Sequence, residues 1–163
     1  ITATGAEPLD DWRPDHAGKA GVDPEQQLAL TKFFDEVTWS RAYKITATSG
    51  PITFSGTLAG QYCSNAEAGG ECRPLLPPFK YDLTVEIAPS TPMPTDAVAS
   101  APAAPYEQLI IPTRPKRDGP KPDAVRYRVW LEPTTAVQGE PVRLHVTATH
   151  EAGWHTYATT QPK

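Results

Sequence analysis

The sequence of 163 residues predicts an all-β protein built as a β-sandwich. Large and small side chains alternate with a period of two in several segments, which is typical of strands that bury one face. Turn-forming residues separate these segments, as in sandwich folds. Hydrophobic residues make up 39% of the chain, enough for a core, and the nineteen prolines indicate many turns and sheet edges.

The N-terminal part is the least regular. Residues 1–4 have strand-like composition, whereas residues 10–24 are polar and rich in turn formers, which predicts a surface loop. The run DPEQ at 23–26 offers an N-cap, a proline at the first helical position and a glutamine behind it. It predicts a short helix over 24–33.

Five later segments carry the strand signal. Each alternates apolar and polar residues or combines β-branched and aromatic residues between turns. These segments are residues 37–48, 51–63, 79–87, 125–133 and 142–160, the last broken near 151–153.

A change of composition divides the chain. Residues 88–123 contain nine of the nineteen prolines together with Ala, Ser and Thr, which predicts an extended linker. It separates residues 1–87, which carry the cysteines, from residues 124–163. Within the linker, YEQLII at 106–111 could add to a sheet edge. The basic run TRPKRDGPKP at its end is interpreted as a solvated segment.

Composition excludes several function classes. The net charge of −4 argues against nucleic acid and against an anionic membrane surface as partners. No stretch approaches 18 consecutive apolar residues, so no transmembrane segment is predicted. The first residues lack a signal-peptide pattern and begin in mid-pattern. We therefore expect that any signal peptide has been removed and that the chain is a fragment.

Neither a metal nor another cofactor is predicted. His145, His150 and His155 follow one another at spacings of five, which places neighbours on opposite faces of a strand. No zinc-type spacing and no hydrolase motif is present. His155, between Trp154 and Tyr157, is interpreted as a packed or edge histidine.

The two cysteines are the strongest functional signal. Cys63 and Cys72 are the only cysteines, and they flank a small, flexible, acidic loop at the end of a strand. They can therefore close on each other and fit an oxidising compartment. Glu67 and Glu71 in this loop would raise a thiol pKa. The residues alone leave two alternatives open, a redox-active dithiol and an inert structural staple.

The motif QYC, a loop, and CRPLLPP resembles the cysteine hairpin of the N-terminal periplasmic domain of DsbD-type transmembrane thiol:disulfide interchange proteins. The segment GWHTYATTQP at 153–162 resembles a second segment of that domain. The resemblance implies an immunoglobulin-like β-sandwich in the periplasm or cell envelope. It also implies that Phe33 and Phe34, ahead of a VTW-type strand, form an aromatic cap that shields the cysteines.

This chain departs from the family pattern in two ways. The cysteine loop and the proline exit are longer than in the family, and the GWHTY segment follows the cysteines, whereas in the family it precedes them. Residues 124–163 therefore either begin a second tandem module or complete the sandwich of residues 1–87, as in a circular permutation. We favour a single composite sandwich.

The resemblance implies a thiol:disulfide exchange module that relays reducing equivalents. Cys72 would form the mixed disulfide with a thioredoxin-like or membrane redox protein, and Cys63 would resolve it. The alternative is a non-catalytic immunoglobulin-like accessory subunit of a larger envelope complex, in which the Cys63–Cys72 bond is only structural.

Overall fold

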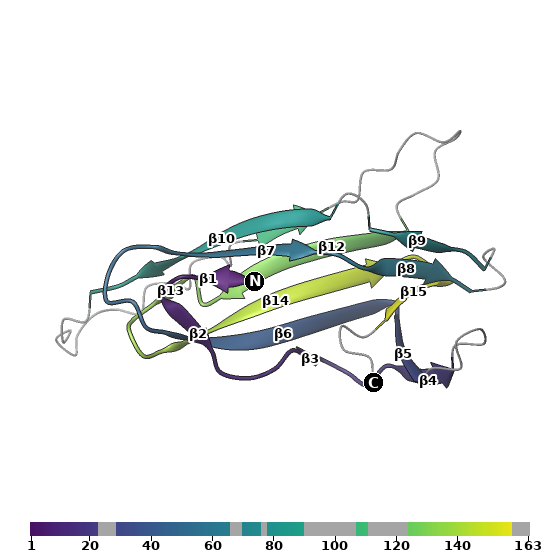
Figure 1. Cartoon of the computed structure of the whole chain (residues 1–163), viewed down its shortest axis with the longest axis horizontal. Helices are drawn as coiled ribbons and strands as arrows, with labels where there is room; N and C mark the ends of the chain where they lie inside the picture. Colours follow the sequence, from purple (N-terminus) through teal and green to yellow (C-terminus); the bar gives the residue numbers. More distant parts are fainter. Residues whose placement is uncertain (23–28, 66–69, 76–77, 90–106, 111–123, 158–163) are drawn as a thin grey trace, which may run out of the picture.

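The computed structural model describes residues 1–22, 29–65, 70–75, 78–89, 107–110 and 124–157. Within these ranges the chain is all-β, without a helix, and its strands form three sheets (Figure 1). Accordingly, the described ranges contain no helix with the length and hydropathy of a membrane span. The predicted all-β class is confirmed.

The first sheet has four strands in the order β1-β7-β10-β13. They are β1 (Thr2–Ala3), β7 (Ile52–Leu58), β10 (Phe79–Ile87) and β13 (Thr135–Ala136). Strands β7 and β10 are antiparallel. In β10, Tyr81, Leu83 and Val85 are buried while Asp82 and Thr84 are exposed, which is the alternation that predicted a strand here.

The second sheet has the order β11-β12-β14-β6-β2, and β3 also pairs with β6. Its strands are β2 (Ala6–Pro8), β3 (Arg13–Pro14), β6 (Glu36–Ile45), β11 (Glu107–Ile110), β12 (Val125–Glu132) and β14 (Pro141–His150). The strands predicted at 37–48 and 125–133, and the first part of the segment predicted at 142–160, are therefore confirmed as β6, β12 and β14. The sheet-edge pairing considered for residues 106–111 is observed over Glu107–Ile110.

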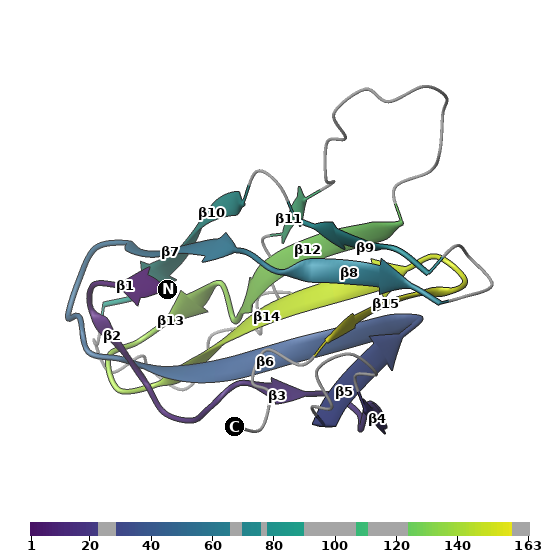
Figure 2. The same ribbon diagram turned by 45° about the vertical axis from the view of Figure 1, so that its right-hand side comes forward.

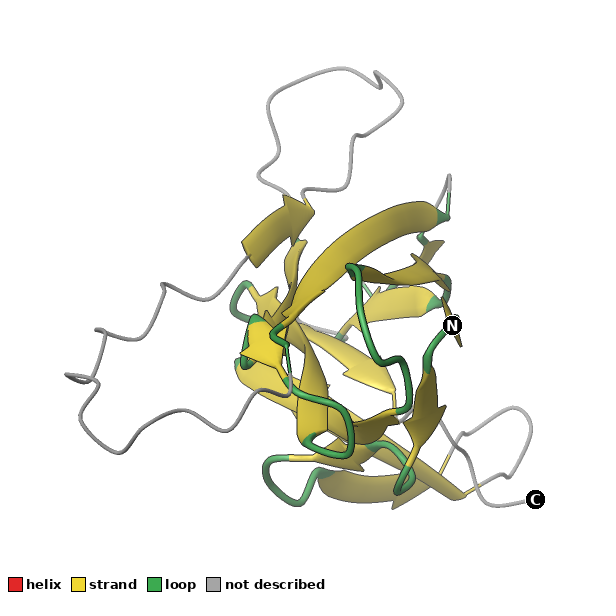
Figure 3. Ribbon diagram, turned by 90° about the vertical axis from the view of Figure 1, so that its left-hand side faces the viewer, coloured by secondary structure: helices red, strands yellow, loops and turns green. Residues whose placement is uncertain are grey.

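These two sheets face each other as the layers of a sandwich, which Figure 3 shows along the long axis of the molecule. Side chains from both layers meet in the core. The rings of Tyr43 from β6 and Phe54 from β7, for example, have centroids 5.2 Å apart. The β-sandwich prediction is therefore supported by the packing, and its immunoglobulin-like character remains a prediction.

The third sheet lies at one end of the sandwich, in the order β4-β5-β15-β8-β9 (Figure 2). It consists of β4 (Lys19–Val22), β5 (Ala29–Phe34), β8 (Gln61–Ser64), β9 (Cys72–Pro74) and β15 (Trp154–Tyr157). Three of these strands are neighbours in the chain of strands from the other sheets, because β5 directly precedes β6, β8 follows β7, and β15 follows β14 after a turn. This small sheet carries both cysteines.

Strands on either side of the proline-rich segment belong to the same sheets. Strand β14 pairs with β6, and β15 lies between β5 and β8. Residues before 88 and after 123 thus contribute neighbouring strands. The division of the chain into modules at these positions remains a prediction, and most of the predicted linker lies outside the described residues.

Two local predictions were wrong. The helix predicted over 24–33 is the strand β5 from Ala29 onward, and residues 23–28 lie outside the described ranges. The loop predicted over 10–24 contains the short strands β3 and β4. Backbone pairing decides the conformation in both cases, because β5 pairs with β15 and β4, and β3 pairs with β6. These pairings outweigh the weak local propensity of the two segments.

Candidate thiol-disulfide site

The two cysteines form a disulfide between neighbouring strands. Cys63 on β8 and Cys72 on β9 are direct partners in an antiparallel pair, with Cα atoms 4.0 Å apart. Beyond them the backbone N–H of Ser64 donates to the carbonyl of Glu71 at 2.8 Å, and the N–H of Glu71 donates to Ser64 Oγ at 2.9 Å. The disulfide and these hydrogen bonds therefore support the same register between β8 and β9.

The two halves of the disulfide differ in access. Cys63 is only 2% exposed because β8 lies inside the sheet, between β15 and β9. Cys72 is exposed because β9 is the edge strand. Exchange requires a thiolate to reach a disulfide sulfur. Cys72 is therefore the more accessible half of the bond.

Four side chains form a row across the third sheet. The strand registers pair Phe34 with His155, His155 with Cys63, and Cys63 with Cys72. Directly paired residues of an antiparallel sheet project from the same face. Phe34, His155, Cys63 and Cys72, which we call the cysteine row, therefore lie side by side on one face.

The two phenylalanines predicted to form a cap lie on opposite faces of β5. Phe33 is 2% exposed and belongs to the core, where its ring lies 5.3 Å from that of Trp39 and 5.6 Å from that of His16. Phe34 is half-buried and packs against His155 with ring centroids 5.0 Å apart. Of the pair, Phe34 alone belongs to the cysteine row.

His155 occupies the centre of the site. It is 3% exposed, which agrees with its interpretation as a packed histidine. Its Nε2 lies 3.4 Å from the Tyr157 hydroxyl, and its buried Nδ1 has no hydrogen-bond partner among the described residues. Burial, followed by the charge of Lys32 and the proximity of His150, lowers the pKa of His155 to about 4. The imidazole is therefore neutral near pH 7.

His150 fixes the bend that brings β5 into this sheet. Its backbone N–H and its Nδ1–H both donate to the carbonyl of Asp35, at 2.6 and 3.0 Å, and its Nε2 lies 3.1 Å from the Thr156 hydroxyl. Asp35 sits between β5 and β6 with a positive φ of 59°, which aspartate tolerates better than most residues. Burial lowers the pKa of His150.

Charge near the cysteines differs from the acidic surroundings that the sequence indicated. Glu71 forms an ion pair with Arg73, whose guanidinium also lies 5.2 Å from the ring of Trp154. The carboxylate that was expected to raise a thiol pKa therefore has a cationic partner next to Cys72. Glu67 lies outside the described residues.

Two lysines reach the same face from other strands. The ammonium of Lys19 on β4 lies 5.0 Å from the centroid of the Phe34 ring, and that of Lys32 on β5 lies 5.9 Å from that of Tyr157. Sequence reasoning did not assign either residue to the cysteine site. Only the pairing of β5 with β15 and of β4 with β5 places them there.

The three histidines do not converge on a metal. The ring of His145 stacks on Trp130 at 4.7 Å in the second sheet, whereas His150 and His155 have the partners given above. The described part of the chain contains no group of three or more His, Cys, Asp or Glu side chains arranged to hold a metal ion.

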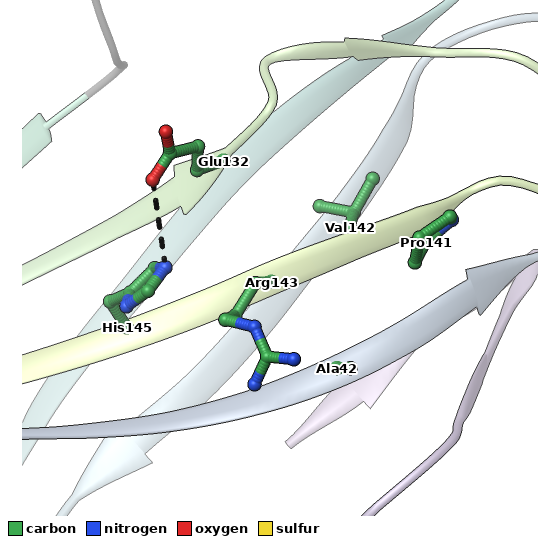
Figure 4. A pocket seen from close by; sticks show the side chains of 6 residues that line it. All are labelled: Ala42, Glu132, Pro141, Val142, Arg143 and His145. Carbon is green, nitrogen blue, oxygen red and sulfur yellow. Dashed lines mark ion pairs between the residues drawn. The ribbon is translucent and has the colours of Figure 1, made fainter. Parts of the chain in front are cut away.

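A second concave region lies on the outer face of the second sheet (Figure 4). This depression of about 260 Å³ is lined by Ala42, Glu132, Pro141, Val142, Arg143 and His145. His145 Nε2 is 3.9 Å from Glu132 Oε2, and Arg143 lies 3.7 Å from Asp10 and 3.4 Å from Ser40. The charged groups of this depression thus interact with one another or with neighbouring side chains on the sheet. The disulfide is therefore the stronger candidate for a functional site.

Comparisons with known proteins identify no relative of this chain. No protein-family model matches the chain, and no curated protein or solved structure is significantly similar to it. The resemblance to the DsbD N-terminal domain therefore remains a prediction from the sequence motifs.

The buried histidines predict a loss of stability in mild acid. Burial lowers the pKa of His145, His150 and His155, so the unfolded chain binds protons before the folded one does. The free energy of unfolding should fall as the pH drops from about 6.5 to about 4, by at most about 3 kcal/mol from His155 alone. Urea unfolding at pH 7, 6 and 5 measures this, and a pH-independent midpoint would contradict it.

Proposed function

We propose that this chain is a thiol:disulfide exchange module that relays reducing equivalents through Cys63 and Cys72. The observation that carries the proposal is the unequal access of the two halves of the bond, with Cys72 exposed on the edge strand and Cys63 2% exposed. Such an arrangement lets one sulfur form a mixed disulfide while the other is kept from unrelated thiols.

The partner would be a protein with its own reactive dithiol, of the thioredoxin-like or membrane redox class. The short strand β9 is the last strand of this sheet in the described part of the chain, and another chain can align along such an edge beside Cys72. Since a disulfide persists in oxidising compartments, we place this exchange in the periplasm or cell envelope. The resemblance to the DsbD N-terminal domain supports the same assignment.

A structural role for the bond is the second candidate. Strand β9 has only three residues, and the disulfide ties this strand to β8. A staple of this kind would suit a non-catalytic immunoglobulin-like interaction subunit of an envelope complex. The two candidates differ in the reduction potential of the bond.

The deciding experiment measures that potential in dithiothreitol redox buffers. Exchange predicts a value between about −270 and −180 mV, and a staple predicts one below about −300 mV. The oxidised protein should also form a covalent complex with a thioredoxin whose resolving cysteine is replaced by serine. Peptide mapping should locate this mixed disulfide at Cys72.

Single-cysteine variants provide the matched controls. Cys63→Ser leaves the exposed sulfur without its resolving partner and should accumulate a mixed disulfide with the same single-cysteine thioredoxin, activated beforehand as its thionitrobenzoate disulfide, because Cys72 then displaces thionitrobenzoate. Cys72→Ser leaves only the buried sulfur and should form little. Equal trapping by both variants, or a potential below about −300 mV with no trapping, would refute the exchange function.

A further inference from the structure

We propose that His155 stabilises the Cys63 thiolate that departs when the disulfide is opened. The inference rests on the proposed exchange function and assigns a further residue to it. From the sequence, His155 was interpreted only as a packed or edge histidine, and its part in the site follows from the position of β15 between β5 and β8.

The strand register places His155 beside Cys63. His155 and Cys63 are direct partners in the antiparallel pair β15–β8. The Cβ atoms of such partners are about 5 Å apart, which is within reach of an imidazole. Phe34 packs on the opposite side of His155, with ring centroids 5.0 Å apart, and restricts its movement away from Cys63.

A ring nitrogen is free to serve this purpose. Among the described residues, Nδ1 of His155 has no hydrogen-bond partner although it is buried. A buried polar atom without a partner is destabilising and rare in native proteins. When the Tyr157 hydroxyl donates to Nε2, the proton of the neutral ring resides on Nδ1. That N–H then lacks an acceptor in the disulfide form and gains one when Cys63 becomes a thiolate.

Atoms and electrons balance in this reaction with the partner dithiol as the only reagent. A thiolate of the dithiol attacks Cys72 Sγ, a new S–S bond forms, and the Cys63–Cys72 bond breaks. Its electron pair moves to Cys63 Sγ, which leaves as a thiolate and accepts the hydrogen bond from His155. The second thiol of the partner, once ionised, attacks its own mixed-disulfide sulfur and releases Cys72 as a thiolate. The partner is oxidised and this chain is reduced by two electrons.

The groups around His155 keep its imidazole neutral. They therefore favour a hydrogen bond from this ring to the Cys63 thiolate over the transfer of a proton from a charged ring. Lys32 on β5 and His150 on β14 both lower the pKa of His155, and burial lowers it most. Tyr157 on β15 contacts Nε2, and Lys19 on β4 lies beyond Phe34. The cysteines themselves, on β8 and β9, complete the set of groups around the ring. The lysines add positive potential that also favours a thiolate.

The test compares three variants in their reaction with dithiothreitol. His155→Phe keeps the ring and removes the donor, and we expect reduction of the disulfide to slow roughly 10- to 100-fold, as for the loss of a hydrogen bond to a charged group. His145→Phe is the same change in the second sheet and should leave the rate unchanged. His155→Gln keeps a neutral N–H donor and should retain most of the rate.

The pKa of Cys63 gives a readout that packing alone would not move. In a Cys72→Ser background, where Cys63 is the single thiol, thiolate absorbance at 240 nm should show this pKa raised by about one to two units in His155→Phe. Unchanged rate and pKa in that variant, or a Gln variant as slow as the Phe variant, would overturn the proposal. If His155→Phe does not fold, a Cys63 pKa well above about 8.5 in the wild type overturns it as well.

These outcomes are separate from the failure of the proposed function. A wild-type protein that forms no mixed disulfide with thioredoxin would refute the relay. The dithiothreitol rates and the Cys63 pKa would still show whether His155 stabilises the thiolate.

Discussion

Replacing Phe33 with alanine is expected to lower the free energy of unfolding by about 3–5 kcal/mol, the usual effect of removing a buried phenylalanine. Phe33 is 2% exposed and lies edge-on to Trp39 at 5.3 Å inside the core. The loss combines apolar burial with the cavity left between the sandwich and the third sheet. Urea unfolding of the disulfide-intact protein measures it.

Phe34→Ala is the matched control on the same strand and should behave differently. Phe34 is half-buried and covers His155 in the cysteine row, so its removal should destabilise by less than Phe33→Ala and speed reduction by dithiothreitol several-fold. Phe33→Ala should leave the reduction rate of the folded protein unchanged. A faster reduction in Phe33→Ala alone would instead assign the shielding role to Phe33.

Replacing Gly56 with alanine is expected to destabilise the sandwich by about 3 kcal/mol, at the upper end of the usual overpacking range. Gly56 on β7 pairs directly with Tyr81 on β10, and a Cβ atom at this position would lie 2.3 Å from Cζ and from the hydroxyl of Tyr81. The tyrosine is 2% exposed and cannot move aside without disturbing the core. Only a glycine lets the ring cross the strand.

Gly60→Ala is the control for this prediction. Gly60 lies in the break between β7 and β8, and a Cβ atom there would meet no heavy atom within 4 Å. The substitution should change stability by no more than about 0.5 kcal/mol. Thermal or urea unfolding of both variants measures these changes in stability. Equal midpoints for Gly56→Ala and the wild type would show that the Tyr81 ring does not require a glycine at position 56.

Periodicity was the reliable predictor of the fold. The alternation in residues 79–87 and 125–133 reappears as β10 and β12, with buried and exposed side chains in the expected order. Both strands pair along most of their length and bury one face against the other layer, so local pattern and tertiary packing agree. The break near 151–153 likewise separates β14 from β15.

Local signals failed where they were short. The capping pattern at 23–26 predicted a helix, yet Ala29–Phe34 form β5 between β4 and β15. A helix of three turns at most is marginal without a packed face, whereas the sheet satisfies the backbone groups of β5 on both sides. The tertiary partner therefore overrides the local preference.

The amino-acid sequence by itself determined that this protein is all-β, and it predicted Cys63 and Cys72 as the candidate site. Period-two patterning and the count and spacing of cysteines are local properties, and they can be recognised along one stretch of chain. The surroundings of the disulfide were decided by the tertiary structure alone. His155 and Lys32 join the face of the sheet that carries Cys63 because β15 pairs with both β5 and β8, and such registers between distant segments depend on the packing of the whole sandwich.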